Sequence, residues 1–317
     1  MSKILCIGEA LIDLICTDKG TTLQHGNHFL KKAGGAPTNV AAAIAALGGD
    51  VTLAAKVGND PFGLHLKEVL QTFGVNCSNV LTSNDAFTTF AFVSLMENGE
   101  RDFYFNRGAD AQLSVSDIQQ LRFSDYSIVH FGSATGFLPG PLQAAYTYAL
   151  DTAIAAGCFI SFDPNYRSLL FGNQQTVFIE KSWHYLRKCN FFKVSDEEAM
   201  LLTNTQDVDA AATQLLEQTQ AVFAITLGKN GTLLGIRGGT YNIPSISIQP
   251  VDTTGAGDAF GGAVLYQLSR LHTHQMQALS ITQWQHIVLN ANKAGARTCE
   301  YLGAMEAFKH LHNSILQ

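Results

Sequence analysis

The sequence predicts an α/β protein with a doubly wound, mostly parallel sheet, helices on both faces of that sheet, and a small second sheet. Along most of the chain, short apolar runs alternate with amphipathic or alanine-rich runs. This alternation is typical of parallel strands connected by helices. Two regions, residues 11–32 and 84–107, break the rhythm because their extended segments have no helices to cover them. These regions are expected to form the second sheet.

Six runs are expected to be buried, mostly parallel strands of the main sheet. Each run is short, continuous and rich in β-branched or aromatic residues, as strands covered on both faces usually are. In chain order they are KILCIG (3–8), VTLAAKVG (51–58), YSIVHFG (126–132), CFISFD (158–163), NFFKV (190–194) and AVFAITLG (221–228).

Five further runs are expected to be helices. Four of them follow strands and are closed by glycine or polar residues, and the fifth is an apolar run with helical spacing. In chain order they are residues 37–49, 61–74, 138–157, 208–220 and 258–270.

The segment 84–107 contains two extended strands joined at residues 97–100, where Asn-Gly is a turn signal. Together with 11–32, it is expected to project from the main domain as a lid over a site. The strands around 88–95 and 101–105 are apolar on both alternations, which is too much apolar surface for a free hairpin. We therefore expect a homodimer formed through the lid.

Composition limits the classes of protein to consider. With 317 residues, 46% hydrophobic and 15% charged, the chain can bury a large core, and residues 1–317 are expected to form one domain. The formal charge of −6, without a run of Lys or Arg, disfavours nucleic-acid and anionic-membrane partners and favours small molecules. No apolar run is long enough to span a bilayer, and Glu9 interrupts the first one. The six cysteines form no CxxC pair, so free thiols and a cytoplasmic location are expected.

The stretch VDTTGAGDAF, residues 251–260, opens an apolar helix with glycines and an acid. Gly255, Ala256 and Gly257 permit a tight turn whose free N–H groups, together with the helix dipole, favour an anion such as phosphate. Asp258 beside that anion can accept a proton from a hydroxyl that attacks phosphorus. The residues alone leave open a second interpretation, in which Asp258 only stabilises its own helix.

Two signatures resemble those of the ribokinase family of sugar kinases, and within it the fructokinases: GGAPTNVAAAIAALGG at 34–49 and DTTGAGDAFGGA at 252–263. The likeness covers almost the whole chain. Further matching segments are GEALIDL (8–14), VGNDPFG (57–63), FDPNYRSLLF (162–171) and ITLGKNG (225–231). The resemblance implies ATP-dependent phosphorylation of a sugar hydroxyl on a doubly wound sheet with a β-lid, often dimeric through that lid.

The resemblance also implies roles for individual residues. Asp258 corresponds to the catalytic base, and the amides of Gly255, Ala256 and Gly257 correspond to the anion hole over the transferring phosphoryl group. The positions that hold sugar hydroxyls are Asp13, Gly34, Gly35 and Asn39, whose acceptors, donors and open backbone suit a polyol. The residues alone leave structural alternatives: Asp13 and Asn39 as turn or helix caps, and the two glycines as a site of close packing.

Nucleotide and metal positions follow from the same resemblance. The nucleotide-binding positions are Lys193, Thr226, Gly228, Gly257 and Asn292. Glu198 lies in a segment that organises magnesium in the family, although Ser195 stands where many relatives have asparagine, and Glu198 could instead be an early-helix acid. A potassium-type ion is implied behind the anion hole, held by oxygens at Asp252, Thr254, Thr298 and Gly303.

Fructose, phosphorylated at its terminal hydroxyl, is the expected substrate because the sugar positions suit a neutral polyol. A keto-acid such as 2-keto-3-deoxygluconate would need a bidentate arginine, for which Arg107 and Arg167 are the candidates. Arg107 is displaced from the position that several relatives use, and Arg167 could instead pair with Asp163. An aminoimidazole riboside or other nucleoside would need stacking surface, which the lid aromatics Phe103, Tyr104 and Phe105 could supply. A non-catalytic sugar-binding regulator is the remaining alternative, and the presence of Asp258 disfavours it.

Overall fold

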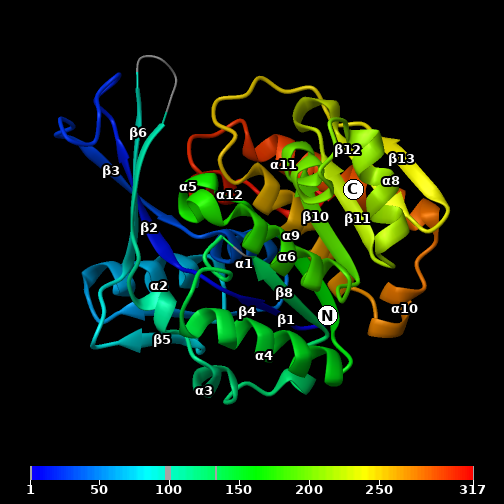
Figure 1. Cartoon of the computed structure of the whole chain (residues 1–317), viewed down its shortest axis with the longest axis horizontal. Helices are drawn as coiled ribbons and strands as arrows, with labels where there is room; N and C mark the ends of the chain where they lie inside the picture. The colour runs from blue at the N-terminus through cyan, green and yellow to red at the C-terminus, as the bar shows by residue number, and fades with distance from the viewer. Residues whose placement is uncertain (1, 97–100, 133, 317) are drawn as a thin grey trace.

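The computed structural model describes residues 2–96, 101–132 and 134–316, which form a large and a small β-sheet (Figure 1). Within these residues the large sheet has nine strands, in the order β13-β12-β11-β10-β9-β8-β1-β4-β5. They are β1 (Ile4–Ile7), β4 (Val51–Gly58), β5 (Val80–Ser83), β8 (Ile128–Gly132), β9 (Phe159–Asp163), β10 (Phe191–Ser195), β11 (Val222–Thr226), β12 (Thr232–Ile236) and β13 (Gly239–Ile243).

Neighbouring strands from β11 to β5 run parallel, whereas β12 and β13 form an antiparallel hairpin at one edge. The chain builds the sheet outward from β1, first to β4 and β5 on one side and then to β8 and beyond on the other. In open sheets of this kind, ligands bind outside the carboxyl ends of the strands where the order changes direction. The change of direction at β1 and β8 therefore places a candidate site at that edge.

Helices cover both faces of the large sheet (Figure 1). One core contains residues of α1 (Ala36–Ala46), α2 (Pro61–Phe73), α9 (Ala256–Ser269), α10 (Thr273–Gln277), α11 (Ile281–Thr298) and α12 (Ala304–Phe308). The other contains residues of α3 (Val115–Ile118), α4 (Pro141–Ala155), α5 (Ser168–Phe171), α6 (Gln175–Leu186), α7 (Asp196–Thr203) and α8 (Val208–Gln218). Successive side chains of β1 alternate between the cores, with Ile4 and Cys6 in the first and Leu5 and Ile7 in the second. The predicted doubly wound class is confirmed.

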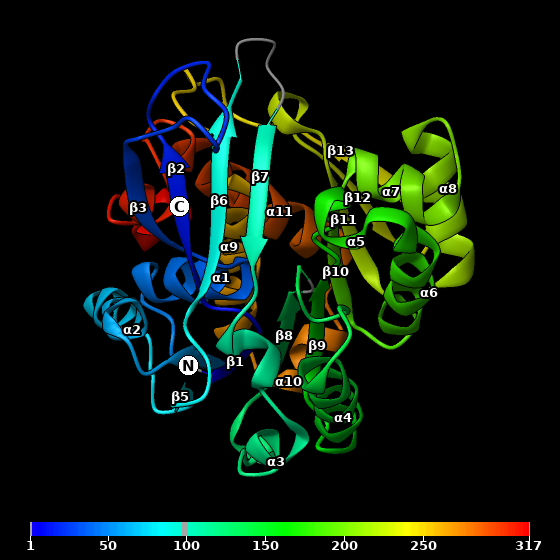
Figure 2. The ribbon, with the colours of Figure 1, turned by 60° about the vertical axis from the view of Figure 1, so that its left-hand side comes forward.

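The small sheet, called the lid below, has the order β3-β2-β6-β7 within the described residues. Its strands are β2 (Leu11–Cys16), β3 (Phe29–Gly34), β6 (Thr89–Leu95) and β7 (Arg101–Asn106). Figure 2 shows these strands side by side, projecting from the large sheet with α9 and α11 behind them. The expected Asn-Gly turn at 97–100 lies outside the described residues.

The structure differs from the expected elements in several ways. It adds β5, β12, β13, α3, α5, α6, α7, α10, α11 and α12, which the apolar pattern does not predict, and it begins α4 at Pro141, three residues after the expected start. It also begins α9 at Ala256, two residues before the expected start, because Gly255 takes a left-handed conformation (φ 81°) as the N-cap. No helix within the described residues is both long and apolar enough to cross a bilayer.

Candidate active site

The predicted site residues gather at the carboxyl edge of the large sheet. The neighbouring strands β9, β10 and β11 end there at Asp163, Ser195 and Thr226, and the register pairs Ser195 with Thr226. The N-terminus of α9 contributes Asp258 in its first turn, and the N-terminus of α1 contributes Asn39. Parallel strands end at the same edge, so residues from distant parts of the chain meet there.

The start of α9 offers free backbone donors. Only glycine fits at position 255, because a Cβ there would collide with Ala304. Among the described residues, the amides of Gly255 and Gly257 have no hydrogen-bond partner, whereas the Ala256 amide donates to the Thr253 carbonyl at 3.2 Å. Two of the three donors predicted for the anion hole are therefore available, and Ala256 is engaged in a turn.

Asp258 contacts the segment 34–49, which carries the other signature of the sequence. The Asn39 side-chain amide donates to Asp258 Oδ2 at 2.9 Å. Their helices approach closely, since a Cβ at Gly262 of α9 would lie 2.8 Å from the Cβ of Ala43 in α1. Burial raises the pKa of Asp258, although Lys193 and the Asn39 hydrogen bond oppose the shift. A carboxyl with a raised pKa at a helix start suits a proton acceptor more than a simple cap.

Lys193 on β10 brings a cation to the same point. Its Nζ forms an ion pair with Asp163 at 2.7 Å and lies 2.9 Å from the position of a Cβ at Gly257. Burial alone would lower the pKa of Lys193, but Asp163 and two further carboxylates raise it above its usual value. The lysine is therefore charged, and its ammonium lies beside the free amides of α9, where a phosphate would bind.

Asp13 and the two glycines predicted to bind the sugar lie close together. The side chain of Asp13, on β2, occupies the space that a Cβ at Gly34 would need, so only glycine leaves room for it. Burial raises the pKa of Asp13 to about 7, while Arg167 acts to lower it and Asp258 to raise it. These two carboxyls and Arg167 are thus close enough to interact electrostatically. Gly35 has a φ of 106° and directs the chain into α1.

Sequence reasoning missed two polar residues of the site, Asp163 and Asn165. Within the described residues, Asp163 Oδ1 and Asn165 Nδ2 are buried without a hydrogen-bond partner, and so is Asn39 Oδ1. Asn165 also has a positive φ of 50°. Buried polar atoms without partners and strained backbone are features of binding sites. Their position just after β9 is a signal that the sequence did offer, because it places them at the carboxyl edge.

The two arginine candidates differ. Arg107 is fully engaged by protein groups: its Nε bonds Asp110 at 3.3 Å, and its terminal nitrogens bond the carbonyls of Pro139 and Thr135, each at 3.1 Å. Arg167 is exposed and bonds only its neighbour's carbonyl among the described residues. The alternative pairing of Arg167 with Asp163 is wrong, since Asp163 pairs with Lys193.

Glu198 is an early-helix acid in this structure. Its carboxylate accepts the Tyr166 amide at 2.6 Å and the Ser195 amide at 2.8 Å, the latter within a capping box. Burial and the neighbouring Asp163 raise its pKa. The described residues contain no group of three or more metal-binding His, Cys, Asp or Glu side chains. A magnesium ion therefore fits here only with phosphate and water oxygens as its main ligands.

The residues predicted to surround a monovalent cation are brought together. Asp252 Oδ1 accepts the Thr254 amide at 3.0 Å and its hydroxyl at 2.7 Å, and Asp252 Oδ2 accepts the Gly303 amide at 2.8 Å. The carbonyl of Thr298 accepts the Tyr301 amide at 3.3 Å in the same loop. These contacts tie the segment before α9 to the segment before α12 and bring the oxygens of both segments close together.

The residues predicted to bind the nucleotide differ in their surroundings. Thr226 ends β11 beside Ser195, and Gly228 follows with a φ of 55°, so both lie at the site's edge. Asn292 on α11 is buried, and its side chain bonds the carbonyls of Ile243 and Pro244 and the hydroxyl of Thr232. Those bonds fasten α11 to the β12–β13 hairpin.

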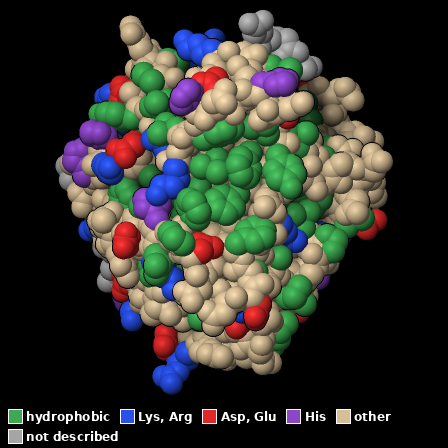
Figure 3. Space-filling view, turned by 90° about the vertical axis from the view of Figure 1, so that its left-hand side faces the viewer, with side chains coloured by type: hydrophobic (Ala, Val, Ile, Leu, Met, Phe, Trp, Pro, Cys, Tyr) green, Lys and Arg blue, Asp and Glu red, His purple; other side chains and the backbone are tan. Residues whose placement is uncertain are grey.

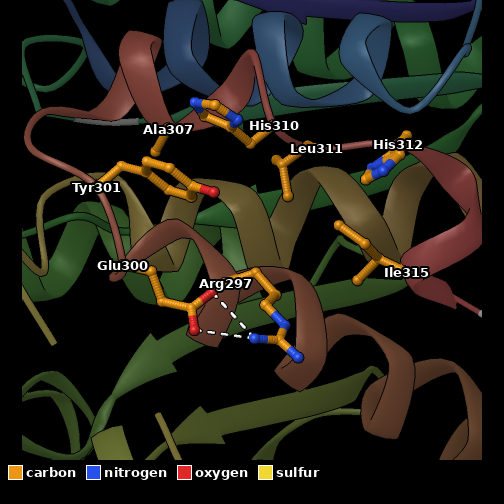
Figure 4. A pocket seen from close by; sticks show the side chains of 8 residues that line it. All are labelled: Arg297, Glu300, Tyr301, Ala307, His310, Leu311, His312 and Ile315. Atoms are coloured by element: carbon orange, nitrogen blue, oxygen red, sulfur yellow. Dashed lines mark hydrogen bonds and ion pairs between the residues drawn. The ribbon is translucent and has the colours of Figure 1, made fainter. Parts of the chain in front are cut away.

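Two cavities lie outside this cluster. One of about 230 Å³, seen in Figure 4, has Tyr301 and His310 stacked at 3.8 Å and Arg297 paired with Glu300 at 2.9 Å. The other, of about 770 Å³, lies against α9 and α11. Neither is lined by a predicted site residue.

Comparison with known proteins agrees with this geometry. The family model described as pfkB family carbohydrate kinase matches residues 1–310. Fructokinase-1 of Zea mays is 33% identical over 307 residues, which cover 95% of this chain and 93% of that protein.

Solved structures are similar over the whole length. A fructokinase from Xylella fastidiosa with bound ATP has a TM-score of 0.86 and 31% identity, covering 99% of this chain and 96% of its own. A fructokinase double mutant from Vibrio cholerae O395, in a form with fructose, ADP and potassium ion bound, has a TM-score of 0.84 and 30% identity. That match covers 100% of this chain and 97% of the other.

Proposed function

This chain belongs to the pfkB family of carbohydrate kinases, and on that premise we propose that it transfers the γ-phosphoryl group of ATP to the terminal hydroxyl of fructose. The observation that carries the proposal is the cluster at the start of α9. There Asp258, bonded to Asn39 at 2.9 Å, lies near two amides without a partner among the described residues and near the Lys193 ammonium, whose side chain is 12% exposed. A base, donors for a phosphate and a fixed cation are the parts that phosphoryl transfer needs.

In the proposed mechanism, Asp258 accepts the proton of the sugar hydroxyl as its oxygen attacks phosphorus. The amides of Gly255 and Gly257 and the ammonium of Lys193 receive the charge of the phosphoryl oxygens. Magnesium, when bound with the nucleotide, would neutralise further phosphate charge, with Glu198 acting through water. Asn39 fixes the carboxylate of Asp258, which keeps its free oxygen directed toward the substrate.

A neutral sugar fits the acceptor side of the site. Asp13 and the unpartnered Asn39 Oδ1 offer acceptors, and the unpartnered Asn165 Nδ2 offers a donor. The Arg107 guanidinium is engaged by Asp110 and two carbonyls, which leaves Arg167 as the single predicted arginine for a substrate carboxylate. This distribution favours fructose over a keto-acid.

A riboside is the second candidate because of two lid rings. Phe105 shares a face of the lid with Asp13, since the register pairs Asp13 with Ala91 and Ala91 with Phe105. Phe103 lies on the same face, 6.2 Å from Phe105 with the rings 11° from parallel. Such rings could stack on the base of an aminoimidazole riboside.

A coupled assay of ADP release tests the substrate. The panel contains fructose, ribose, 2-keto-3-deoxygluconate, adenosine and aminoimidazole riboside, each at the same ATP concentration. We expect fructose to have the highest kcat/KM. A value at least tenfold higher for another member, about 1.4 kcal/mol in transition-state binding, would reassign the substrate. No turnover with any member would contradict the proposal itself.

The proposal includes a potassium-type ion beside the anion hole. Asp252, Thr254 and the Gly303 loop are held together by the hydrogen bonds described above, and an ion among their oxygens would steady the start of α9. Replacing potassium by tetramethylammonium at constant ionic strength should lower kcat by at least about threefold. An unchanged rate would argue against the ion.

We also propose a homodimer formed through the lid and a cytoplasmic location. On the face opposite Asp13, the rings of Phe29, Phe90 and Tyr104 lie 6.0–6.3 Å from that of Phe92. Tyr104 is 59% exposed. Figure 3 shows hydrophobic side chains gathered near the centre of the face that carries the lid. A patch of this kind is typical of a subunit interface. The six free cysteines suit a reducing compartment.

A further inference from the structure

Glu9, which follows β1, is a buried acid that the proposed chemistry does not use. Its side chain is 0% exposed, yet both of its carboxyl oxygens contact protein groups. Glu9 Oε1 accepts the amide of Ala36, the first residue of α1, at 3.2 Å. Glu9 Oε2 lies 3.4 Å from the hydroxyl of Thr135. Removing a carboxyl group from water costs free energy, and hydrogen bonds to protein groups offset part of that cost. A buried carboxyl with such bonds therefore suggests a specific structural role.

The contacts of Glu9 fix the turn that carries the sugar-binding residues. Besides the Ala36 amide, its backbone carbonyl accepts the Thr38 hydroxyl at 2.8 Å. That carbonyl also lies against Gly35, where a Cβ would collide with it. Glu9 thus contacts Gly35, Ala36 and Thr38 at the turn between β3 and α1, and Asn39 follows directly. A shift of Glu9 would therefore move Gly34, Gly35 and Asn39 together.

On its other side, Glu9 reaches the foot of the lid. The Thr135 carbonyl accepts a hydrogen bond from Arg107, which directly follows β7. Arg107 in turn bonds Asp110, which is 1% exposed, and Asp110 accepts the hydroxyl of Thr89 at the start of β6. Both ends of the β6–β7 hairpin are therefore tied to one buried chain of polar groups that ends at Glu9.

We propose that Glu9 is a positioning residue, a buried neutral carboxylic acid that holds the sugar-binding turn in place and connects it, through Thr135, Arg107 and Asp110, to the foot of the lid. This role explains why Arg107 contacts protein groups instead of facing the sugar. It rests on the proposed function in that Gly34, Gly35 and Asn39 are taken as sugar ligands.

The surroundings of Glu9 favour its neutral form. Burial raises its pKa to about 8; the Ala36 amide and Arg167 act to lower it, and Asp110 acts to raise it. Tyr146 on α4 also lies near, but its hydroxyl donates to the carbonyls of Ile7 and Gly132. Arg107 bonds Asp110 and not Glu9. Above pH 8, ionised Glu9 would face the carboxylate of Asp110 without a bonded cation, which loosens the turn.

Steady-state kinetics between pH 6 and 9.5 test the proposal with Glu9→Gln, Glu9→Ala and a matched control, Glu217→Gln, on the exposed face of α8. Glutamine reproduces a neutral acid, so Glu9→Gln should keep the sugar KM within about twofold at pH 7. Wild type should show a rise in the sugar KM with a midpoint near pH 8, and Glu9→Gln should lack this rise. Glu9→Ala should raise KM at least tenfold while kcat falls less. Equal pH profiles for wild type and Glu9→Gln would overturn the proposal.

Hydrogen–deuterium exchange at pH 7 without substrate keeps this test separate from the choice of sugar. Glu9→Ala should increase exchange both in peptides covering 34–40 and in peptides covering 101–110, and Glu9→Gln should increase it in neither. Faster exchange in the first segment alone would overturn the connection to the lid. If Glu9→Ala does not fold, wild type and Glu9→Gln are compared with each other at pH 9. Wild type should then exchange faster than Glu9→Gln in both segments, because only wild type has an ionisable group at position 9. Failure of the sugar panel would leave this result intact.

Discussion

Asp258 is the residue on which the proposed chemistry depends most directly. Its carboxyl has a raised pKa and is oriented by Asn39. Asp258→Asn keeps the shape and the hydrogen bond but removes the proton acceptor. We expect kcat to fall at least a hundredfold, about 2.7 kcal/mol, with little change in sugar KM. Near-normal turnover in the coupled assay would remove Asp258 from the mechanism.

If Asp13 binds the sugar as proposed, sugar binding should depend on its ionisation in the opposite direction to that of Glu9. Burial raises its pKa to about 7, so it is mostly protonated at pH 6 and mostly ionised at pH 8. The ionised form is the better acceptor for sugar hydroxyls, and the sugar KM should therefore fall as pH rises from 6 to 8. Asp13→Asn should raise KM and flatten this dependence. If the sugar KM of Asp13→Asn still falls between pH 6 and pH 8, this pH dependence belongs to another group.

The resemblance to the ribokinase family named Asn39 and Asp258, each in a signature with unusual glycines, but it did not predict the hydrogen bond between them. It did not predict the importance of Asp163, whose role depends on Lys193 from the next strand and on a buried oxygen without a partner. The contacts of Arg107 could not be predicted from the sequence either. An arginine near a lid suggests a ligand, but its contacts with Asp110 and two carbonyls arise only when the chain folds.

At the scale of elements, the start of α9 offers a matched pair of glycine substitutions. A Cβ at Gly257 would lie 2.9 Å from Lys193 Nζ, whereas at Gly261 the nearest atom, on Val40, is 4.0 Å away. Because the end of a lysine side chain moves easily, Gly257→Ala should fold normally but displace the ammonium and lower kcat about tenfold.

Gly261→Ala, in the interior of the same helix, should leave kcat unchanged and stabilise the protein by about 0.5–1 kcal/mol. Thermal melts and the coupled assay measure both variants. Equal activity of Gly257→Ala and Gly261→Ala would argue that the position of Lys193 does not matter.

Strands buried on both faces were the easiest elements to predict, since β1, β4 and β8–β11 are continuous apolar runs. The hairpin β12–β13 was missed because β13 is half exposed and its sequence, GTYNI, contains turn-forming residues. The early start of α9 was missed because it depends on a left-handed glycine, which no apolar pattern records.

At the scale of the whole molecule, the aromatic face of the lid predicts the oligomeric state. Tyr104→Glu places a charge on an exposed ring of this face and should shift a dimer toward monomer at micromolar concentration. Ile154→Glu, at an exposed position of α4, is the control and should leave the dimer unchanged. Light scattering distinguishes the two outcomes. A monomeric wild type would contradict the dimer.

The hydrogen bond between Asn39 and Asp258 joins residues 219 positions apart. At roughly 5–20 residues per second, about 10–45 s of synthesis separate them on the ribosome. During that interval α9 has not been made, so Val40 and Ala43, against which α9 packs in the folded chain, lack that partner. The proposed active centre is therefore assembled late in translation, and a chain released before α9 is made would lack both the proposed base and the proposed phosphate site.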